Sequence, residues 1–289
     1  MEAMSLAVVY SRAAVGINAP LVSVETHLAN GLPALSIVGL AREVAAATGA
    51  QLRWPDPSVE ESGDSTAEHL RVDVADQELC PVFVGRYIES VRVGPSPWDV
   101  QKRLIAAGVR PISNIVDASN YVLMELGKPI HTFDAAAVGA GHIIVRTARA
   151  GERLETLDHV ERELTEDTLL ITDPEGPLAI AGVMGGAASE VGDETTDVIL
   201  ESAIFHPVSV RRTAFRYALR SEASLRFEKG QEHRMARLGA DRTAALMQRW
   251  AGGRVARGVV DTQPEPPKQV RIPFRPARVS GLLGEVVGV

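Results

Sequence analysis

The chain has 289 residues, of which 45% are hydrophobic, and its formal net charge at pH 7 is -7. This size predicts one large or two ordinary globular domains, whereas the negative charge excludes a general nucleic-acid coat, which needs an excess of Lys and Arg. The single cysteine, Cys80, excludes a disulfide framework and a cysteine-built zinc site, and without a secretory leader or an apolar run of about 18 residues we expect a cytoplasmic protein with no membrane partner.

The first 40 residues are expected to form a short β-rich appendage. Three apolar segments alternate with Gly16, Pro20 and a Gly-Leu-Pro turn, a pattern typical of short strands. The segments cover residues 6–10, 22–26 and 35–38. The runs 5–20 and 31–40 resemble the opening of the magnesium-chelatase-related ATPase family that includes the competence protein ComM. No G-x-x-x-x-G-K-[ST] phosphate loop follows, so ATPase activity is not expected.

A helix and a linker are expected next. Residues 41–50 predict the helix, and residues 51–69 predict the linker because Pro55, Pro57 and several acids leave too little apolar content to bury. The main domain is therefore expected over residues 70–263.

The first helix of this domain is expected between a proline and a glycine. Ser96 and Pro97 predict its start, since Ser caps free amides and Pro fits the first turn, and Gly108 predicts its end. Its buried side is expected to carry Val100, Leu104 and Ile105.

A second, amphipathic helix is expected within the run 111–131. Gly127 suits the left-handed residue that closes a helix, and Pro129 forbids continuation, so His131 is held in a fixed exit segment. The residues expected on its buried side are Val116, Tyr121, Val122, Met124 and Leu126.

The rest of the domain mixes strands and helices. A last long helix is expected over 235–250, before Gly252. Because the elements do not alternate regularly, the sequence predicts an α+β fold with mixed and antiparallel sheets and packed helices. A second linker is expected over 264–268. Strand-like runs occur at 143–146, 168–172, 178–183 and 198–205.

Two blocks carry a specific resemblance. The run 111–134, with its Ser-Asn pair and histidine, closely resembles the B3/B4 editing module in the beta subunit of bacterial phenylalanine-tRNA ligase, and the run 221–230 is similarly family-like. The resemblance covers residues 41–289, of which 269–289 match only the start of the next domain, B5. Because residues 1–40 resemble another family, a chimeric chain is predicted.

Glu201 is an acid within an otherwise apolar strand. Burying a carboxylate without a partner is costly, and the pattern alone favours a strand-end acid that accepts hydrogen bonds from the backbone or an arginine. The resemblance implies instead that Glu201 recognises the phenolic hydroxyl of tyrosine wrongly attached to phenylalanine tRNA. Phenylalanine would leave that acid unpaired, so the correct product would be spared.

Small residues are expected around the same ligand. The spacing of Gly182, Gly185 and Gly186 excludes a dinucleotide loop and by itself favours a simple turn, whereas the resemblance implies that these glycines shape an amino-acid pocket. By the same resemblance, Ala223 leaves room for the tyrosine ring and Ser221 offers a hydroxyl. Taken alone, both are typical of a surface loop or a helix start.

His131, Asn120 and Ser119 are the predicted catalytic residues, since the resemblance places them in the site. A Ser-His pair suggests a nucleophile, but no third group and no G-x-S-x-G motif is present. We therefore expect water to attack, positioned by His131 and Asn120, with the cis-diol of the terminal adenosine assisting proton transfer. A single histidine is otherwise typical of a structural role.

Arg110 is the predicted tRNA-binding residue. The resemblance implies that it contacts the terminal nucleotide, and the alternative is a solvated cation at a helix end. The implied partners are the acceptor end of tRNA(Phe) and the ligase alpha subunit, and no cofactor or metal is implied.

Two functions remain open from the sequence. The first is an editing hydrolase that cleaves mischarged Tyr-tRNA(Phe), weakened by the absence of remote tRNA contacts. The second is a non-catalytic beta-subunit fragment that binds tRNA or the alpha subunit weakly or is inert. Ligation is not expected, because in the family the aminoacylation site lies on the alpha subunit.

Overall fold

The computed structural model describes residues 8–12, 21–25 and 37–263, together with the single positions 275, 278, 281 and 284. Strands β1 (Val8–Arg12) and β2 (Leu21–Glu25) pair antiparallel, as the first two apolar segments predict. The third segment was expected to be a strand, but Ile37 and Val38 begin helix α1 (Ile37–Thr48), and residues 35 and 36 lie outside the described part. These two β-branched residues are followed by a run of good helix formers, and the helix extends over them.

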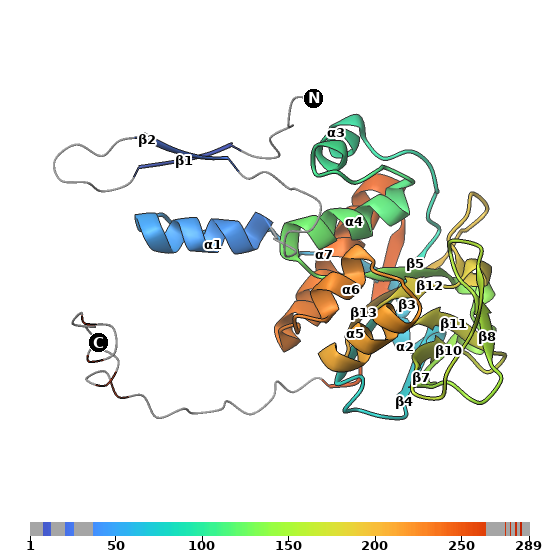
Figure 1. The fold of residues 1–289 in the computed structure, drawn as a ribbon. Helices are drawn as coiled ribbons and strands as arrows, with labels where there is room; N and C mark the ends of the chain where they lie inside the picture. The colour runs from blue at the N-terminus through green and yellow to red at the C-terminus, as the bar shows by residue number, and fades with distance from the viewer. Residues whose placement is uncertain are drawn as a thin grey trace.

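A six-stranded sheet holds the centre of the main domain (Figure 1). Its order is β3-β14-β5-β13-β6, with β15 also pairing β5, and within this sheet the β3–β14 pair is parallel. Its strands are β3 (Glu61–Ser65), β5 (Val82–Glu89), β6 (His131–Asp134), β13 (Val198–Ile204), β14 (Arg254–Arg257) and β15 (Val260–Asp261).

A second sheet has five strands in the order β12-β11-β10-β7-β4, in which only β4 and β7 run parallel. A separate hairpin pairs β8 (Arg153–Glu155) with β9 (Glu161–Glu163). The strands of the second sheet are β4 (Arg71–Val74), β7 (His142–Thr147), β10 (Leu169–Thr172), β11 (Pro177–Ile180) and β12 (Met184–Gly185). Two mixed sheets with separate helices confirm the predicted α+β class.

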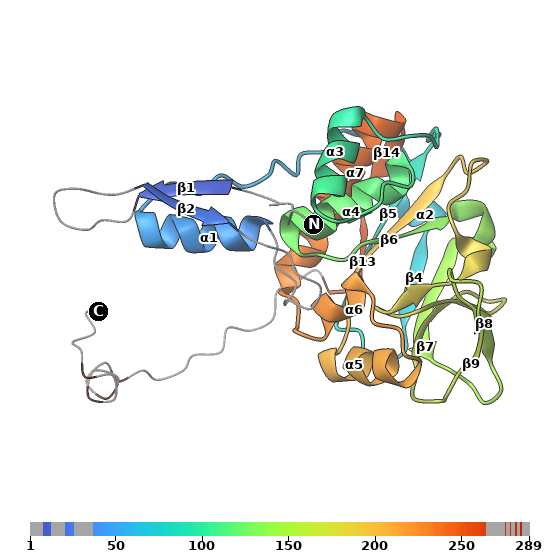
Figure 2. The same cartoon turned by 45° about the horizontal axis from the view of Figure 1, so that its top comes forward.

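Helices α4 and α7 lie together on one side of the six-stranded sheet, and the five-stranded sheet lies on the other (Figure 2). The helices of the main domain are α2 (Thr66–His69), α3 (Trp98–Ala106), α4 (Asn114–Leu126), α5 (Pro207–Arg216), α6 (Glu222–Phe227) and α7 (His233–Ala251). Short 3-10 turns are η1 (Ala135–Ala137), η2 (Gly139–Gly141) and η3 (Ala187–Ser189). Within the described chain, no helix combines the length and the apolar character that crossing a bilayer requires.

Strand β13 separates two apolar cores. Its residues Val198 and Leu200 pack into the core formed with α4 and α7, whereas Ile199 and Ala203 pack into the core shared with the five-stranded sheet. Because side chains alternate along a strand, Glu201 belongs to the same face as Ile199 and Ala203. The acid therefore lies between the two sheets.

Helix α3 differs from its prediction in its N-terminal cap and in its buried side. Ser96 does not cap the helix. The N-cap residue is Pro97, which makes no side-chain hydrogen bond, and the Ser96 hydroxyl donates to the Asp117 carboxylate at 2.6 Å. Val100 and Leu104 are buried as expected, but Ile105 is 47% exposed. The helix has only nine residues, and its buried face is narrower than the spacing of its apolar residues predicts.

Helix α4 confirms the expected stop. Gly127 has φ 72°, in the left-handed region, and its N–H donates to the Leu123 carbonyl. Val122 and Leu126 are buried, while the other three predicted core positions are only partly buried.

The expected linker over 51–69 is wrong from residue 61 onward. β3 adds to the sheet edge beside β14, and Glu61 binds the fully buried guanidinium of Arg86 at 2.8 Å. The hydroxyl of Thr66, also fully buried, donates to the Gly258 carbonyl at 2.9 Å. Polar residues here bind partners far along the chain, which local composition does not reveal. The predicted linker 264–268 and the start of B5 lie outside the described residues, apart from four isolated positions in the latter.

Candidate functional site

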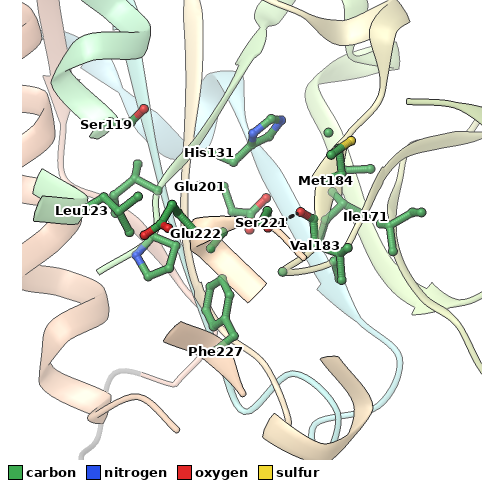
Figure 3. Close-up of a pocket in the computed structure, with 18 of the residues that line it drawn as sticks. Ser119, Leu123, His131, Ile171, Val183, Met184, Glu201, Ser221, Glu222 and Phe227 are labelled. Carbon is green, nitrogen blue, oxygen red and sulfur yellow. Dashed lines mark hydrogen bonds between the residues drawn. The ribbon is translucent and has the colours of Figure 1, made fainter. Parts of the chain in front are cut away.

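A cavity of about 290 Å³ opens between the two sheets. Its walls come from the end of α4, the start of β6, the turn between β11 and β12, strand β13 and helix α6. In Figure 3 the side chains of Glu201 and His131 lie near the centre, with Leu123 on one side and Val183 on the other. This volume suits a ligand of about the size of one large side chain, since pockets for drug-sized ligands start at about 300 Å³.

Strand register places the acid beside the imidazole. β6 and β13 pair antiparallel, and Glu201 lies directly opposite His131. Opposed residues on neighbouring strands present their side chains on the same face, with Cβ atoms about 5 Å apart. Two residues 70 positions apart in sequence thus reach one cavity through an ordinary backbone ladder.

The Glu201 carboxylate is buried and has no hydrogen-bond partner within the described residues. Only 5% of the residue is exposed. Burial raises the pKa of Glu201 from 4.5 to about 7, and the attraction of Lys128 opposes this rise. The strand-end acid satisfied by backbone or arginine, expected from the pattern alone, is therefore not what the structure contains. An acid of this kind can accept a hydrogen bond from a ligand hydroxyl.

His131 is neutral at neutral pH, because burial lowers its pKa from 6.5 to about 4. Its ring packs edge-on against Phe133, with ring centroids 4.5 Å apart, and no hydrogen bond to its nitrogens occurs within the described part of the chain. A neutral imidazole has one donor and one acceptor nitrogen. It can orient a water molecule or an ester, but it is a weak base.

The three glycines lie where a Cβ atom would contact a neighbouring group too closely. A Cβ on Gly185 would lie 2.5 Å from Cε1 of His131, so only glycine leaves space for the imidazole. Gly182 has φ +69°, and a Cβ there would lie 2.9 Å from Phe205. A Cβ on Gly186 would lie 2.5 Å from the Leu178 carbonyl oxygen. Gly182 and Gly185 line the cavity, where the sequence predicted them.

The two predicted serines line the cavity but have committed hydroxyls. Ser119 donates to the Val116 carbonyl of its own helix at 2.7 Å. The Ser221 hydroxyl donates to the Val183 carbonyl at 2.8 Å, and as the N-cap of α6 it accepts from the Ser224 N–H. Both hydroxyl protons are thus engaged in structural bonds, which argues against either serine as a nucleophile.

Asn120 and Ala223 line the cavity, but Arg110 does not. The Asn120 amide has no hydrogen-bond partner among the described residues, so it is available to a ligand. Ala223 is partly buried at the second position of α6, and its small side chain adds little bulk to the wall. Arg110 is exposed beyond the end of α3, as a solvated cation would be.

Lys128 was missed by sequence reasoning. It lies between Gly127 and Pro129, where a lysine is ordinarily expected to be exposed, yet it is fully buried and its ammonium group donates to the Ala203 carbonyl. Burial lowers the pKa of Lys128 from 10.5 to about 7, and the attraction of Glu201 opposes this fall. The available signal was its position inside the run 111–134, three residues before His131.

A further titratable cluster lies outside the cavity. One ligand atom each from Asp64, His69 and Glu89 lie within 4.8 Å of one another. The guanidinium of Arg254 already binds the Glu89 carboxylate, so a divalent cation would meet a positive charge there. The cluster joins β3, α2 and β5 as an ion-pair network.

These features define an α+β domain with a small cavity, whose wall holds a buried acid opposite a neutral histidine. The chain belongs to the B3/4 domain family, which matches residues 79–252. It is 46% identical over 255 residues to the phenylalanine-tRNA ligase beta subunit of Geobacter metallireducens and 47% identical over 255 residues to that of Nitratidesulfovibrio vulgaris. Each alignment covers 88% of this chain and 32% of the relative, so the chain spans about a third of the length of these relatives.

A solved N-terminal fragment of the phenylalanyl-tRNA synthetase beta subunit from Pyrococcus horikoshii aligns at 15% identity with a TM-score of 0.39, covering 88% of this chain and 69% of that one. The predicted B3/B4 domain is thus confirmed by the family match. The ATPase-like origin of residues 1–40 stays a prediction.

Proposed function

We propose that the cavity hydrolyses the ester of tyrosine wrongly attached to tRNA(Phe), as an editing module of a phenylalanine-tRNA ligase beta subunit. The observation that carries this proposal is the buried, unbonded carboxylate of Glu201, directly opposite His131 in a cavity of one-side-chain size. In this proposal the protein acts in the cytoplasm, and its partners are the acceptor end of tRNA(Phe) and the ligase alpha subunit.

Selectivity arises from the hydrogen-bonding need of Glu201. A tyrosine hydroxyl donates to the carboxylate, whereas a phenylalanine ring displaces water and leaves the acid without a partner. Sites of this type discriminate by about 10⁴ or more. Ala223 and the glycines Gly182 and Gly185 leave the space that the aromatic ring occupies.

Hydrolysis joins a water oxygen to the ester carbonyl carbon and breaks the bond from that carbon to the ribose oxygen, which takes up a proton. His131 and Asn120 have free polar atoms facing the cavity and hold the water or the ester in place. The neighbouring ribose hydroxyl assists the proton transfer. Ser119 has its proton committed to Val116, so its role is to support the α4 wall.

The test is a deacylation assay with purified protein on Tyr-tRNA(Phe) and Phe-tRNA(Phe). We expect faster release of tyrosine, and we expect Glu201→Ala to abolish the preference for tyrosine because the acceptor is gone. Glu222→Ala is the matched control: Glu222 lines the same cavity, but its carboxylate is already paired with Arg226 at 2.6 Å. Release of both amino acids at the rate of buffer alone would contradict the proposal.

The second candidate is a non-catalytic beta-subunit fragment that binds tRNA or the alpha subunit. It is favoured by the coverage, since the chain spans 32% of its relatives' length and remote contacts contribute binding energy to catalysis. Exposed Arg110 is the residue proposed to contact the terminal nucleotide. Binding of deacylated tRNA(Phe) without ester hydrolysis would support this second function.

A further inference from the structure

The burial of Lys128 calls for a physical reason. The residue is fully buried and makes no ion pair within the described residues, although burying a charge without a partner is strongly unfavourable. Its ammonium donates to the Ala203 carbonyl and lies over the Phe227 ring, 4.9 Å from the ring centroid. These contacts satisfy part of its hydrogen-bonding capacity, but neither partner carries a negative charge.

The position of Lys128 is fixed by the sheet. Strand β6 pairs with β13 only as far as the Glu201–His131 pair, so Ala203 lies two residues beyond the end of β6. There the lysine ammonium binds the Ala203 carbonyl in place of a strand. Ala203 lies two residues from Glu201, which is about 7 Å along the strand, and Phe227, under the ammonium, lines the same cavity as Glu201. The bond therefore brings the positive charge to the segment of β13 that carries Glu201.

Helix α7 is shaped to admit the lysine. A Cβ on Gly239 would lie 2.7 Å from Cγ of Lys128 and 3.1 Å from Cδ1 of Ile130. Gly239 lies inside the helix, where glycine is less favourable than alanine. A buried ammonium and a glycine within a helix are each unfavourable alone. Here the glycine leaves the space that the Lys128 side chain occupies.

Among the groups that the structure describes, Lys128 is the one whose charge favours ionised Glu201. His131 is neutral at neutral pH, and the Glu222 carboxylate is paired with Arg226. Burial raises the pKa of the Cys80 thiol, which therefore stays uncharged. The attraction between Lys128 and Glu201 favours the charged form of each.

We propose that Lys128 is a positioning residue of the editing cavity: its buried ammonium keeps Glu201 in the carboxylate form that accepts a ligand hydroxyl. The selectivity part of this inference rests on the proposed function, whereas the electrostatic part concerns the protein alone. Lys128 does not line the cavity, so it acts on the ligand only through Glu201.

The first experiment measures the pKa of Glu201 by carbon NMR of its labelled carboxyl group, in the full chain and without substrate. Lys128→Met keeps an unbranched side chain, one heavy atom shorter than lysine, and removes the charge. We expect it to raise the pKa of Glu201 by about one unit or more. The matched control is Lys102→Met, which removes an exposed lysine on α3 and is expected to leave that pKa unchanged. An unchanged pKa in folded Lys128→Met overturns the proposal.

A reciprocal measurement decides the matter if Lys128→Met does not fold. Coupling between two sites is reciprocal, so the isosteric variant Glu201→Gln is expected to lower the pKa of the Lys128 ammonium by the same amount. No change in that pKa overturns the proposal.

The third measurement is the pH profile of the deacylation preference. Because tyrosine selectivity needs ionised Glu201, the preference rises with pH, and Lys128→Met is expected to move this rise to higher pH by the shift seen in the NMR titration. A profile that loses amplitude without moving indicates a purely structural role and overturns the proposal. If the wild-type protein hydrolyses neither ester, the proposed function fails, while the NMR titrations still decide the coupling.

Discussion

At the scale of single residues, the site depends on which polar groups the fold leaves free. The side chains of Glu201, His131 and Asn120 face the cavity without hydrogen-bond partners in the described chain. The hydroxyls of Ser119 and Ser221 instead donate to backbone carbonyls. Sequence alone assigned all five to one site but could not separate these two groups. A hydroxyl's partner is set by the tertiary position of a carbonyl, which no local pattern encodes.

Gly185→Ala is the sharpest test of the histidine's position. The added Cβ would lie 2.5 Å from the His131 ring and 3.1 Å from Leu157, so the imidazole must move by a sizeable fraction of an ångström. We expect deacylation of Tyr-tRNA(Phe) to fall by about 100-fold, since displacements near 1 Å have that effect on catalysis.

The matched control for Gly185→Ala is Gly176→Ala, in the turn between β10 and β11. A Cβ there meets no atom within 4 Å, so activity should be retained. Thermal unfolding of both variants checks that the fold persists. Full activity in Gly185→Ala would show that the position of His131 does not matter.

At the scale of elements, a buried arginine joins three parts of the main domain. Arg86 of β5 is fully buried and binds Asp241 of α7 at 2.6 Å and Glu61 of β3 at 2.8 Å. These ion pairs link a strand, a helix and the segment that composition alone assigned to a linker. The charge of Glu61 contributed to that wrong assignment, because acids in a proline-rich stretch are typical of solvent-exposed chain.

Arg86→Met is expected to lower the free energy of unfolding by about 3 to 5 kcal/mol, because it leaves two acids near a buried site without their main cation. Urea denaturation measures this loss. Arg237→Met is the matched control: Arg237 also binds Asp241, at 2.9 Å, but its side chain is 49% exposed, and exposed pairs contribute about 1 kcal/mol or less. Equal losses in the two variants would contradict a special role for the buried pair.

The elements that the sequence predicted well are those with a local signature. Helix α4 ends at Gly127 as expected, because a left-handed closing residue is encoded by glycine itself. The strand at Glu201 was likewise predicted from its apolar flanks. By contrast, the cap of α3 was assigned to Ser96, whose hydroxyl instead bonds Asp117, 21 residues away. A serine at this position can cap a helix, but here its hydroxyl binds a residue that is distant in sequence.

At the scale of the whole molecule, the main domain begins before the boundary expected from composition. Residues 61–69 add an edge strand, the Glu61 ligand of Arg86 and the buried Thr66 hydroxyl. The family match itself starts only at residue 79. The extent of the folded domain is therefore larger at this end than either the composition or the matched region indicates.

A truncation series tests this boundary. A chain that starts at residue 70 should unfold with a free energy about 3 kcal/mol or more below that of a chain that starts at residue 51, because it lacks a partner of buried Arg86. Both chains lack α1, so the comparison isolates the segment between the two starts. Thermal and urea unfolding followed by circular dichroism provide the measurement, and equal stabilities would restore the linker assignment.

The pairing of β6 with β13 sets a constraint on redesign of the cavity. His131 faces Glu201 because three residues separate it from Gly127, and shifting a strand by one residue turns every side chain to the opposite face. One inserted or deleted residue in that short turn would direct the imidazole into the helical core and detach the lysine from its carbonyl. Engineers can therefore exchange side chains on the walls one at a time, but the spacing of this turn is the part of the cavity that must be kept.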